Sequence, residues 1–272
     1  MVELELHNRK ISTELPAFVM GIVNANNDSF WEKSRGNAEK AFALIKEGAD
    51  IIDVGGESTR PGSEYVPEDE EIRRVVPVIQ AIRSESDIPI SVDTRKKNVM
   101  KAAFEAGADI LNDISALEDD SEMAEFCASV KIPVILMHKR GIPSEMQKNT
   151  DYSNVFEEVN SYLLERAAFA ESMGISPEKI IVDPGVGFGK DLNGNVSLIK
   201  NIGRLCGGKY KILMALSRKT CIGQMTGRDV QERLAGTLAA DLISVMKGAE
   251  LVRVHDVKET VDTLKVLGYI NR

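Results

Sequence analysis

The sequence predicts an α/β protein that folds as a single (β/α)8 TIM barrel. Eight short apolar runs are spaced along the chain, and a segment with helix-like spacing of apolar residues follows each of them. Unbroken aliphatic runs are typical of parallel strands that are covered on both faces. Eight such strands alternating with helices predict a closed barrel. The length of 272 residues is close to the ~250 typical of one barrel, so we expect one domain over residues 1–272.

Each predicted strand ends in polar residues. The runs are, in order, FVMGIVN, ADIIDVGGE, IPISVD, ADILND, PVILMH, KIIVDP, KILMALSRK and ELVRVHD. In this fold the active site lies at the carboxyl ends of the strands. We therefore expect the polar endings to meet at one mouth: Asn24, Asp53, Glu57, Asp93, Asn112, Asp113, His138, Asp183, Ser217, Arg218, Lys219, Arg253, His255 and Asp256.

The segments between the strands predict amphipathic helices. In VFEEVNSYLLERAAFAESMG, for example, the apolar residues recur at near-helical spacing. Three helices should end at Gly48, Gly107 and Gly248, each followed by alanine and an acidic residue that opens the next strand. Glycine accepts the left-handed conformation that ends a helix. Pro77 predicts a kink or a restart in DEEIRRVVPVIQAIR.

Two connections after strands are longer than barrel closure requires. NANNDSFWEKSRGN follows the first strand and GGESTRPGSEYVPEDE follows the second. Long loops at the catalytic mouth commonly cover or clamp a substrate. The first carries Phe30 and Trp31, and the second carries Arg60. We expect both to act at the site, the alternative being ordinary surface loops.

Composition excludes several functional classes. The chain has 42 acidic and 34 basic residues and a net charge of −8, which argues against a nucleic-acid partner. No apolar run reaches the ~18 residues of a membrane span, and the start MVELELHNRK has no signal-peptide core. The three cysteines show no CxxC spacing, so we expect packing roles in a reduced, cytoplasmic protein.

Eight sequence motifs follow one another along the chain. They are MGIVNANNDSF, GADIIDVGGESTRPG, PISVDTRKKNV, GADILNDIS, VILMHKRGIPSEMQ, DPGVGFGK, SRK and RVHDV. Together they resemble the dihydropteroate synthase family of pterin-binding TIM barrels, over nearly the whole chain. The resemblance implies a transferase of folate synthesis that uses Mg2+, forms a homodimer and is a sulfonamide target.

A pterin ring needs a pocket with both donors and acceptors. Asp93, Asn112 and Asp183 end the third, fourth and sixth strands. A carboxylate accepts from the ring NH and amino groups, and asparagine serves in both senses. Lys219 offers a donor to the ring acceptors. We predict that Asp93, Lys219 and Arg253 are catalytic, whereas the alternative for Asp93 is a helix N-cap before TRKKN.

The diphosphate of the substrate needs positive charge. Arg253 and His255 alternate along the last strand and therefore share one face. The arginine fork suits phosphate oxygens, and the loops after the last two strands are the common phosphate site of this fold. The resemblance implies that the RVH segment binds the diphosphate, and we add Thr59 to that pocket. The role of His138 stays open.

The resemblance also implies the remaining ligands. Asn24 should ligate a Mg2+ that touches the diphosphate, since Mg2+ prefers oxygen ligands and often keeps water. An aromatic carboxylate such as para-aminobenzoate needs an apolar wall with a cation or a helix N-terminus. The glycine-rich loop around one predicted wall residue, Phe188, should let that ring move. The predicted para-aminobenzoate pocket consists of Phe30, Thr59, Arg60, Pro61, Phe188 and Ser217.

The loop after the first strand departs from the family. The family usually reads NVTPDSF followed by SDGG, whereas this chain reads NANNDSF followed by WEKS. Asn26 and Asn27 replace the Thr-Pro pair, and Glu32 after Trp31 replaces the usual aspartate. Without the rigid proline we expect a more flexible loop. A catalytically altered pterin-binding paralogue is therefore one alternative.

We expect condensation of 6-hydroxymethyl-7,8-dihydropterin diphosphate with para-aminobenzoate to 7,8-dihydropteroate and pyrophosphate. A methyltetrahydrofolate-dependent corrinoid methyltransferase is a second alternative, but it needs no diphosphate site such as Arg253 and His255. A metal-dependent hydrolase through His138, His255 and Asp183 lacks an H-x-H pair after the first strand. A Schiff-base aldolase through Lys219 is the last alternative.

Overall fold

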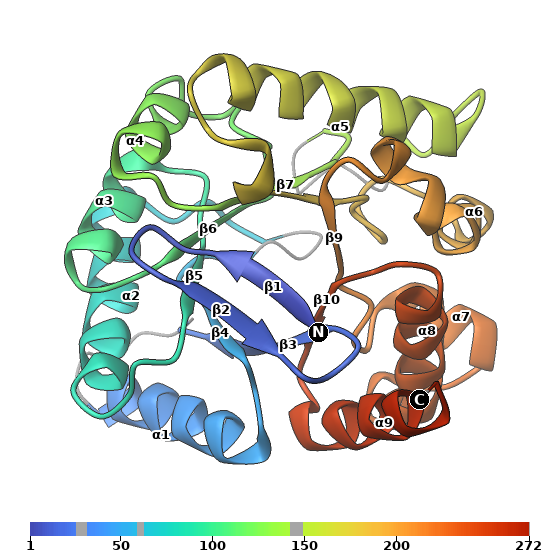
Figure 1. Cartoon of the computed structure of the whole chain (residues 1–272), viewed down its shortest axis with the longest axis horizontal. Helices are drawn as coiled ribbons and strands as arrows, with labels where there is room; N and C mark the ends of the chain where they lie inside the picture. The colour runs from blue at the N-terminus through green and yellow to red at the C-terminus, as the bar shows by residue number, and fades with distance from the viewer. Residues whose placement is uncertain (26–31, 59–62, 142–148, 272) are drawn as a thin grey trace.

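A computed structural model describes residues 1–25, 32–58, 63–141 and 149–271. It confirms the closed parallel barrel, whose strands follow the order β10-β3-β4-β5-β6-β7-β8-β9 (Figure 1). The barrel strands are β3 (Phe18–Asn24), β4 (Ile51–Gly55), β5 (Ile90–Asp93), β6 (Ile110–Asp113), β7 (Val134–Met137), β8 (Ile180–Asp183), β9 (Lys211–Met214) and β10 (Leu251–Val254).

Helices surround the barrel in the predicted alternation (Figure 1). They are α1 (Glu32–Glu47), α2 (Glu68–Arg83), α3 (Lys97–Glu105), α4 (Met123–Val130), α5 (Val155–Ser172), α6 (Leu192–Asn201), α7 (Thr220–Thr226), α8 (Leu234–Met246) and α9 (Val257–Ile270), with short 3-10 turns η2 (Pro177–Lys179), η3 (Ile202–Gly208) and η4 (Val230–Glu232).

The predicted helix ends are confirmed at three glycines. Gly48, Gly107 and Gly248 have φ of 101°, 111° and 110°, in the left-handed region. These values suit glycine, which has no Cβ to clash. Pro77 lies inside α2, which runs as one helix from Glu68 to Arg83, so the predicted restart does not occur.

The alternation of side chains along each strand places the polar residues inside the barrel. Ile51 belongs to the cluster that fills the interior, whereas its neighbour Ile52 packs on the outer side beneath the helices. Residues two positions apart share a face of a strand. Ile110, Ile181 and Leu251 also fill the interior. The residues two positions further on, toward the carboxyl ends, are Asp53, Asn112, Asp183 and Arg253, so the interior changes there from apolar to polar.

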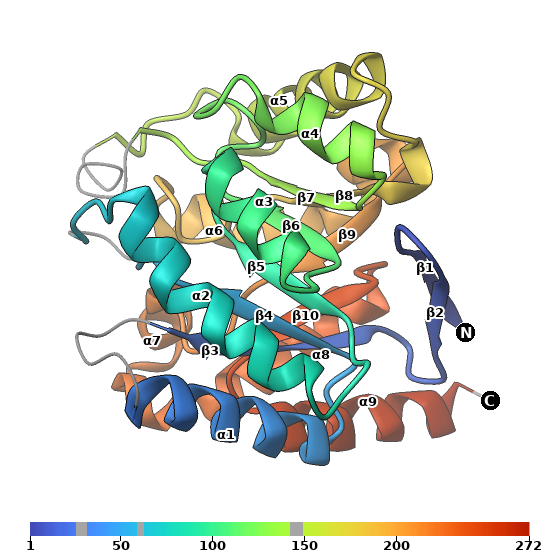
Figure 2. The same cartoon turned by 90° about the vertical axis from the view of Figure 1, so that its left-hand side faces the viewer.

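A hairpin that the sequence reading missed closes the other end of the barrel. It pairs β1 (Val2–Glu5) with β2 (Lys10–Thr13) in antiparallel register. Leu4 and Leu6 are 1% and 2% exposed and join the interior cluster with Phe18 and Ile51, which lie at the amino ends of their strands. The hairpin crosses the barrel axis in Figure 1 and lies at one end in Figure 2. The interior is therefore closed at the amino ends of the strands.

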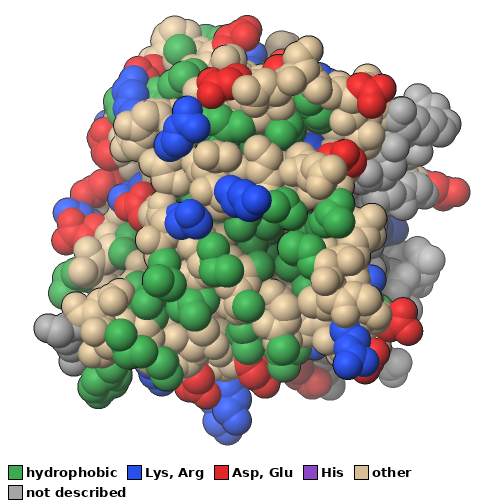
Figure 3. Space-filling view, turned by 90° about the vertical axis from the view of Figure 1, so that its right-hand side faces the viewer, with side chains coloured by type: hydrophobic (Ala, Val, Ile, Leu, Met, Phe, Trp, Pro, Cys, Tyr) green, Lys and Arg blue, Asp and Glu red, His purple; other side chains and the backbone are tan. Residues whose placement is uncertain are grey.

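Two neighbouring helices carry exposed apolar side chains on one side of the molecule. Met246 on α8 is 66% exposed, and Val266, Tyr269 and Ile270 on α9 are 60%, 74% and 75% exposed. Figure 3 shows hydrophobic side chains gathered on this side. Large apolar patches of this kind mark interaction surfaces. No helix in the described part of the chain combines the length and apolar character that a membrane crossing needs.

Candidate functional site

Arg253 ties together the ends of three strands inside the barrel. Its Nε donates to Asp53 Oδ2 at 2.6 Å, and its Nη2 donates to Asp93 Oδ2 at 2.9 Å. Asn112 Nδ2 lies 3.4 Å from both carboxylate oxygens of Asp53. Four strands, β4, β5, β6 and β10, therefore bring these side chains to one place. Charge-assisted bonds of this kind are among the strongest polar contacts in proteins.

Asp53 belongs to this group: it was expected at the mouth from its place at a strand end, but no ligand contact was assigned to it. It is 0% exposed and bonded to both Arg253 and Asn112. The signal was present in the sequence, because Asp53 follows Ile51 at the same two-residue spacing that separates Ile110 from Asn112.

The buried position of Asp93 changes its acid-base behaviour. Burial raises its pKa to about 7, against the opposing charge of Arg253, and the neighbouring Asp53 raises it further. Near neutral pH this carboxyl group can therefore accept or donate a hydrogen bond. The alternative of a helix N-cap does not hold, since the N-cap of α3 is Lys96 and Asp93 bonds to Arg253.

Asp183 and Lys219 lie near each other at the ends of β8 and β9. Asp183 Oδ1 accepts from the Gly185 amide at 2.7 Å, and burial raises the pKa of the carboxyl group, with Lys219 opposing that shift. Burial lowers the pKa of the Lys219 ammonium, with Asp183 opposing. The Lys219 Nζ atom donates to Val186 O at 2.5 Å and lies 4.8 Å from the Phe188 ring centroid. The carboxylate, the cation and the aromatic ring predicted from the sequence are thus neighbours.

His255 and Ser217 form a pair at the end of β10. Ser217 Oγ lies 3.0 Å from His255 Nδ1, and the His255 amide donates to the same Oγ at 3.1 Å. His255 stands two residues beyond Arg253, on the same face, but its ring bonds to Ser217 while Arg253 bonds to carboxylates. Arg218, the middle residue of the SRK turn, pairs with Asp256 through two bonds of 2.7 Å and 2.9 Å.

Several predicted site residues lie outside the described residues. These are Phe30, Thr59, Arg60 and Pro61, together with Asn26, Asn27 and Trp31 of the divergent loop; the Glu32 side chain is likewise outside. Asn24, the predicted Mg2+ ligand, is described: it ends β3, is exposed, and is paired in register with Gly55 on β4.

His138 does not face the group around Arg253. It is 6% exposed, and its Nδ1 lies 2.9 Å from the Nζ atom of Lys190. Burial lowers the pKa of His138 to about 3, and the nearby Lys190 lowers it further, so the ring is neutral at physiological pH. Since His138 is bonded to Lys190 and His255 to Ser217, the geometry does not favour a hydrolase that uses both histidines.

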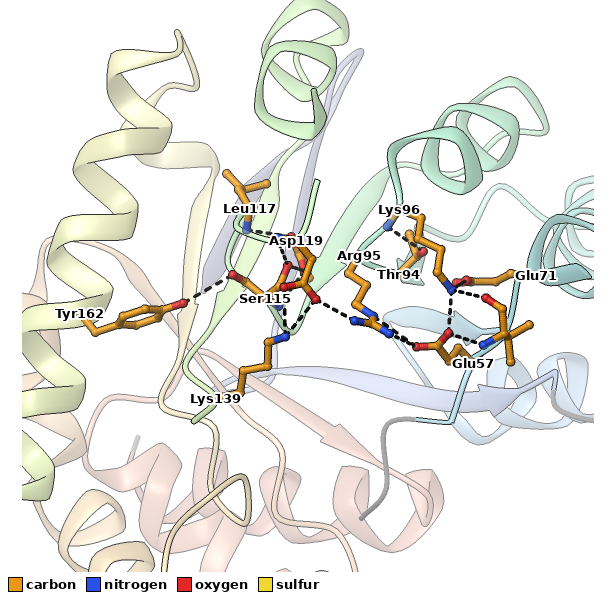
Figure 4. A network of polar contacts seen from close by, with 12 residues as sticks. Glu57, Glu71, Thr94, Arg95, Lys96, Ser115, Leu117, Asp119, Lys139 and Tyr162 are labelled. Carbon is orange, nitrogen blue, oxygen red and sulfur yellow. Dashed lines mark hydrogen bonds and ion pairs between the residues drawn. The ribbon is translucent and has the colours of Figure 1, made fainter. Parts of the chain in front are cut away.

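The buried side chain of Lys96 fixes the end of the long connection between β4 and α2. Lys96 Nζ donates to Glu57 Oε2 and Glu71 Oε2, both at 2.6 Å, and to Val66 O at 2.7 Å (Figure 4). Glu57 Oε2 in turn accepts from the Val66 amide at 2.9 Å. Burial alone would raise the pKa of Glu57, but Lys96 and the Val66 amide hold it below its usual value. Both backbone polar groups of Val66 are therefore fixed by charged side chains.

The same network extends around the mouth. Arg95 joins Glu57 at 2.9 Å to Asp119 at 2.8 Å, and Lys139 donates to Asp119 at 2.9 Å (Figure 4). A small hollow beside the network is lined by Glu57, Glu71 and Asp93 among others, so the network borders the Arg253 group. Glu57 was expected at the mouth, whereas Arg95, Lys96, Asp119 and Lys139 were not, because charged residues after a strand commonly face solvent.

Comparisons with known proteins agree with this geometry. The model of a family described as pterin binding enzyme matches residues 20–255. The dihydropteroate synthase of Escherichia coli (strain K12) is 44% identical over 254 residues, which are 92% of this chain and 90% of that protein. The structure of Xanthomonas albilineans dihydropteroate synthase with 4-aminobenzoic acid superposes with a TM-score of 0.91 at 41% identity, covering 99% of this chain and 98% of that one. The same organism's enzyme in complex with 7,8-dihydropteroate gives a TM-score of 0.88 at 38% identity, with coverage of 99% and 98%.

Proposed function

The chain belongs to the pterin-binding enzyme family and has the transferase function of a dihydropteroate synthase, and we propose how its barrel residues divide that work. The substrates are 6-hydroxymethyl-7,8-dihydropterin diphosphate and para-aminobenzoate, and the products are 7,8-dihydropteroate and pyrophosphate. The observation that carries the proposal is the convergence of Asp53, Asp93 and Asn112 on Arg253, with Asp183 and Lys219 beside them.

The carboxylates hold the pterin. Asp93 and Asp183 are buried acceptors for the ring NH and amino groups, and Asn112 offers a donor and an acceptor. Lys219 donates to the ring acceptors. When the C–O bond to the diphosphate breaks, positive charge spreads from the exocyclic carbon into the ring. Preorganised carboxylates in a water-poor site stabilise such a charge by several kcal/mol in typical cases.

Arg253 and its polar neighbours at the mouth bind the diphosphate leaving group. In the described residues, the bonds of Arg253 to the carboxylates use Nε and Nη2, which leaves Nη1 for a phosphate oxygen. His255 lies two residues further on and donates from its ring to the same group, and Thr59 is the third predicted contact. Asn24 would hold a Mg2+ ion whose remaining ligands are diphosphate oxygens and water. A single exposed amide oxygen suits a metal that binds together with the substrate.

The amine nucleophile is para-aminobenzoate. Its nitrogen forms a C–N bond to the exocyclic carbon, loses a proton, and displaces pyrophosphate. Phe188 supplies an apolar wall, and Ser217 with the start of α7 offers donors to the carboxylate. Phe30, Thr59, Arg60 and Pro61 complete the proposed pocket. Sulfonamides mimic this substrate, so they should compete with it.

The exposed apolar side chains of α8 and α9 support a homodimer. Ile243 and Met246 on α8 are exposed, as are Val266, Tyr269 and Ile270 on α9, and the two helices pack against each other. A second copy of the chain would remove them from water. We place the enzyme in the cytoplasm, since Cys127, Cys206 and Cys221 are all buried and free, as expected in a reducing compartment.

A turnover assay tests the proposal. Purified protein with the pterin diphosphate, Mg2+ and para-aminobenzoate should release pyrophosphate and form dihydropteroate, and a sulfonamide should inhibit competitively with para-aminobenzoate. No turnover in the presence of normal pterin binding would identify the catalytically altered paralogue instead.

Two variants test the pterin pocket by calorimetry. Asp183→Asn and Lys219→Met should each abolish measurable pterin binding, because each removes a buried partner of the ring. Lys211→Met is the matched control: this lysine pairs with Glu250 at the far end of the barrel, so its loss should leave the affinity unchanged. Unchanged affinity in the two pocket variants would refute the assignment.

A further inference from the structure

Lys190 is a buried lysine that the proposed reaction does not use. It is 3% exposed, and it ends the glycine-rich DPGVGFGK segment that carries Phe188. Lysine is almost never fully buried unless its ammonium group is paired. Its partners here are neutral acceptors rather than a carboxylate, which sets it apart from Lys96.

Three polar atoms surround the Lys190 Nζ atom. Nζ donates to Phe188 O at 2.8 Å and to Gly185 O at 2.9 Å, and it lies 2.9 Å from His138 Nδ1. Burial lowers the pKa of Lys190 well below its ordinary value, Lys219 and Arg140 lower it further, and Asp183 opposes them. The amine donates to the two loop carbonyls in either protonation state, because a neutral amine still has two N–H groups.

His138 completes this arrangement. Its neutral ring places Nδ1 2.9 Å from the Lys190 Nζ atom, and this contact ties the lysine to the end of β7. The loop also approaches the end of β7 very closely: a Cβ on Gly185, at φ +65°, would lie 1.9 Å from His138 O. Only glycine fits there, and the close approach brings the loop carbonyls within reach of Lys190.

Other side chains fix the remaining backbone groups of the same loop. The Gly187 amide donates to Asn195 Oδ1 at 2.7 Å, and Asn195 Nδ2 donates to Lys190 O at 3.2 Å. Val186 O accepts from Lys219. The glycines of this loop predict movement of the Phe188 ring, and these bonds anchor the backbone that carries it.

We propose that Lys190 and His138 form a positioning unit that sets the Phe188 wall of the para-aminobenzoate pocket. The inference rests on the proposed function of that pocket. By bonding Gly185 O and Phe188 O at once, Lys190 fixes both ends of the Gly185–Phe188 turn relative to β7. The wall is then already in place when the second substrate arrives, so less ordering is needed on binding. Neither residue touches the reacting atoms.

Lys190→Met tests this role. The methionine fills a similar volume without any donor, so the turn loses two carbonyl anchors. We expect KM for para-aminobenzoate to rise about tenfold to a hundredfold, as displacements near 1 Å commonly do. KM for the pterin diphosphate should change much less. His138→Phe, which keeps a ring but removes Nδ1, should act in the same direction with a smaller effect.

Lys179→Met is the matched control. Its Nζ also bridges two backbone carbonyls, Leu6 O at 3.0 Å and Lys131 O at 2.6 Å, but at the closed end of the barrel. This variant should lose thermal stability and keep both KM values. Hydrogen exchange should also speed up in the peptide spanning residues 184–190 only in Lys190→Met.

The outcomes separate the two proposals. Faster exchange with a raised KM for para-aminobenzoate alone supports the positioning role. An active Lys190→Met enzyme whose KM values match those of Lys179→Met would overturn it and leave the proposed function standing. A wild-type protein without synthase turnover would overturn the proposed function, and unchanged exchange would then also remove the anchoring role.

Discussion

Replacing Arg253 by methionine isolates the central ion cluster of the barrel. The variant keeps an unbranched side chain that ends short of the guanidinium position, and it leaves the buried Asp53 and Asp93 without their cation. Removing one partner of a buried ion pair typically costs about 3–5 kcal/mol, because the other charge stays buried. The unfolding entropy is about 2.1 cal/mol/K per residue, or about 0.6 kcal/mol/K for 272 residues. The expected fall in Tm is therefore about 5–9 °C.

The fall in Tm caused by Arg253→Met should depend on pH in a defined direction. The folded pKa of Asp93 lies near 7, above the ordinary value of 3.8. A group whose pKa is raised by folding favours the folded state at low pH, and this contribution is lost as the pH rises through the folded value. Without Arg253 the pKa of Asp93 should rise further. The fall in Tm should consequently be larger at pH 8 than at pH 5.5, where the carboxyl group is protonated.

Thermal unfolding followed by circular dichroism at one scan rate measures both effects. Arg253→Lys keeps the charge without the fork and should lose less than Arg253→Met. Asp93→Asn combined with Arg253→Met should lose less than the sum of the single changes, by about 0.5–3 kcal/mol. A Tm for Arg253→Met equal to that of the wild type at both pH values would refute the reasoning.

Two further predictions concern other buried side chains of the barrel. Asp241 on α8 is 1% exposed, and neither carboxyl oxygen bonds to any described residue, so Asp241→Ala should raise Tm. Burial raises the pKa of Asp241 well above its ordinary value, so the gain should be larger at pH 8 than at pH 5; a lower Tm in calorimetry would contradict this. Leu6→Ala removes a buried side chain that closes the amino end of the barrel. The free energy of unfolding should therefore fall by about 2–5 kcal/mol in denaturant titrations, while both KM values stay unchanged. An altered KM would show that the closed end communicates with the mouth.

The barrel could be predicted because each strand carries its own local signal. The apolar runs and their helix-ending glycines lie within a few residues of one another, so Gly48, Gly107 and Gly248 could be assigned from sequence alone. The site followed from the fold, since the two-residue alternation turns Asn112, Asp183 and Arg253 inward. Asp53 was likewise expected at the mouth, but the sequence did not show its contact with Arg253.

What the sequence did not reveal depends on contacts between distant segments. The hairpin strands β1 and β2 have four residues each, too few for a clear alternation, and their pairing with the barrel end depends on tertiary packing. From the sequence, Lys190 is expected to be a surface charge after a glycine-rich loop, because nothing local shows that His138, 52 residues away, lies within hydrogen-bond distance of it. Lys96 was missed for the same reason.

The hairpin that fills the amino end with Leu4 and Leu6 has a consequence for the order of events. A heterocycle bound beside Asp53 and Asn112 can enter and depart in one direction alone, past the ends of the strands. Any molecule seated among the loops above it obstructs that passage. We therefore expect the pterin to bind before para-aminobenzoate. The condensed product should leave whole, past the same strand ends through which the pterin entered.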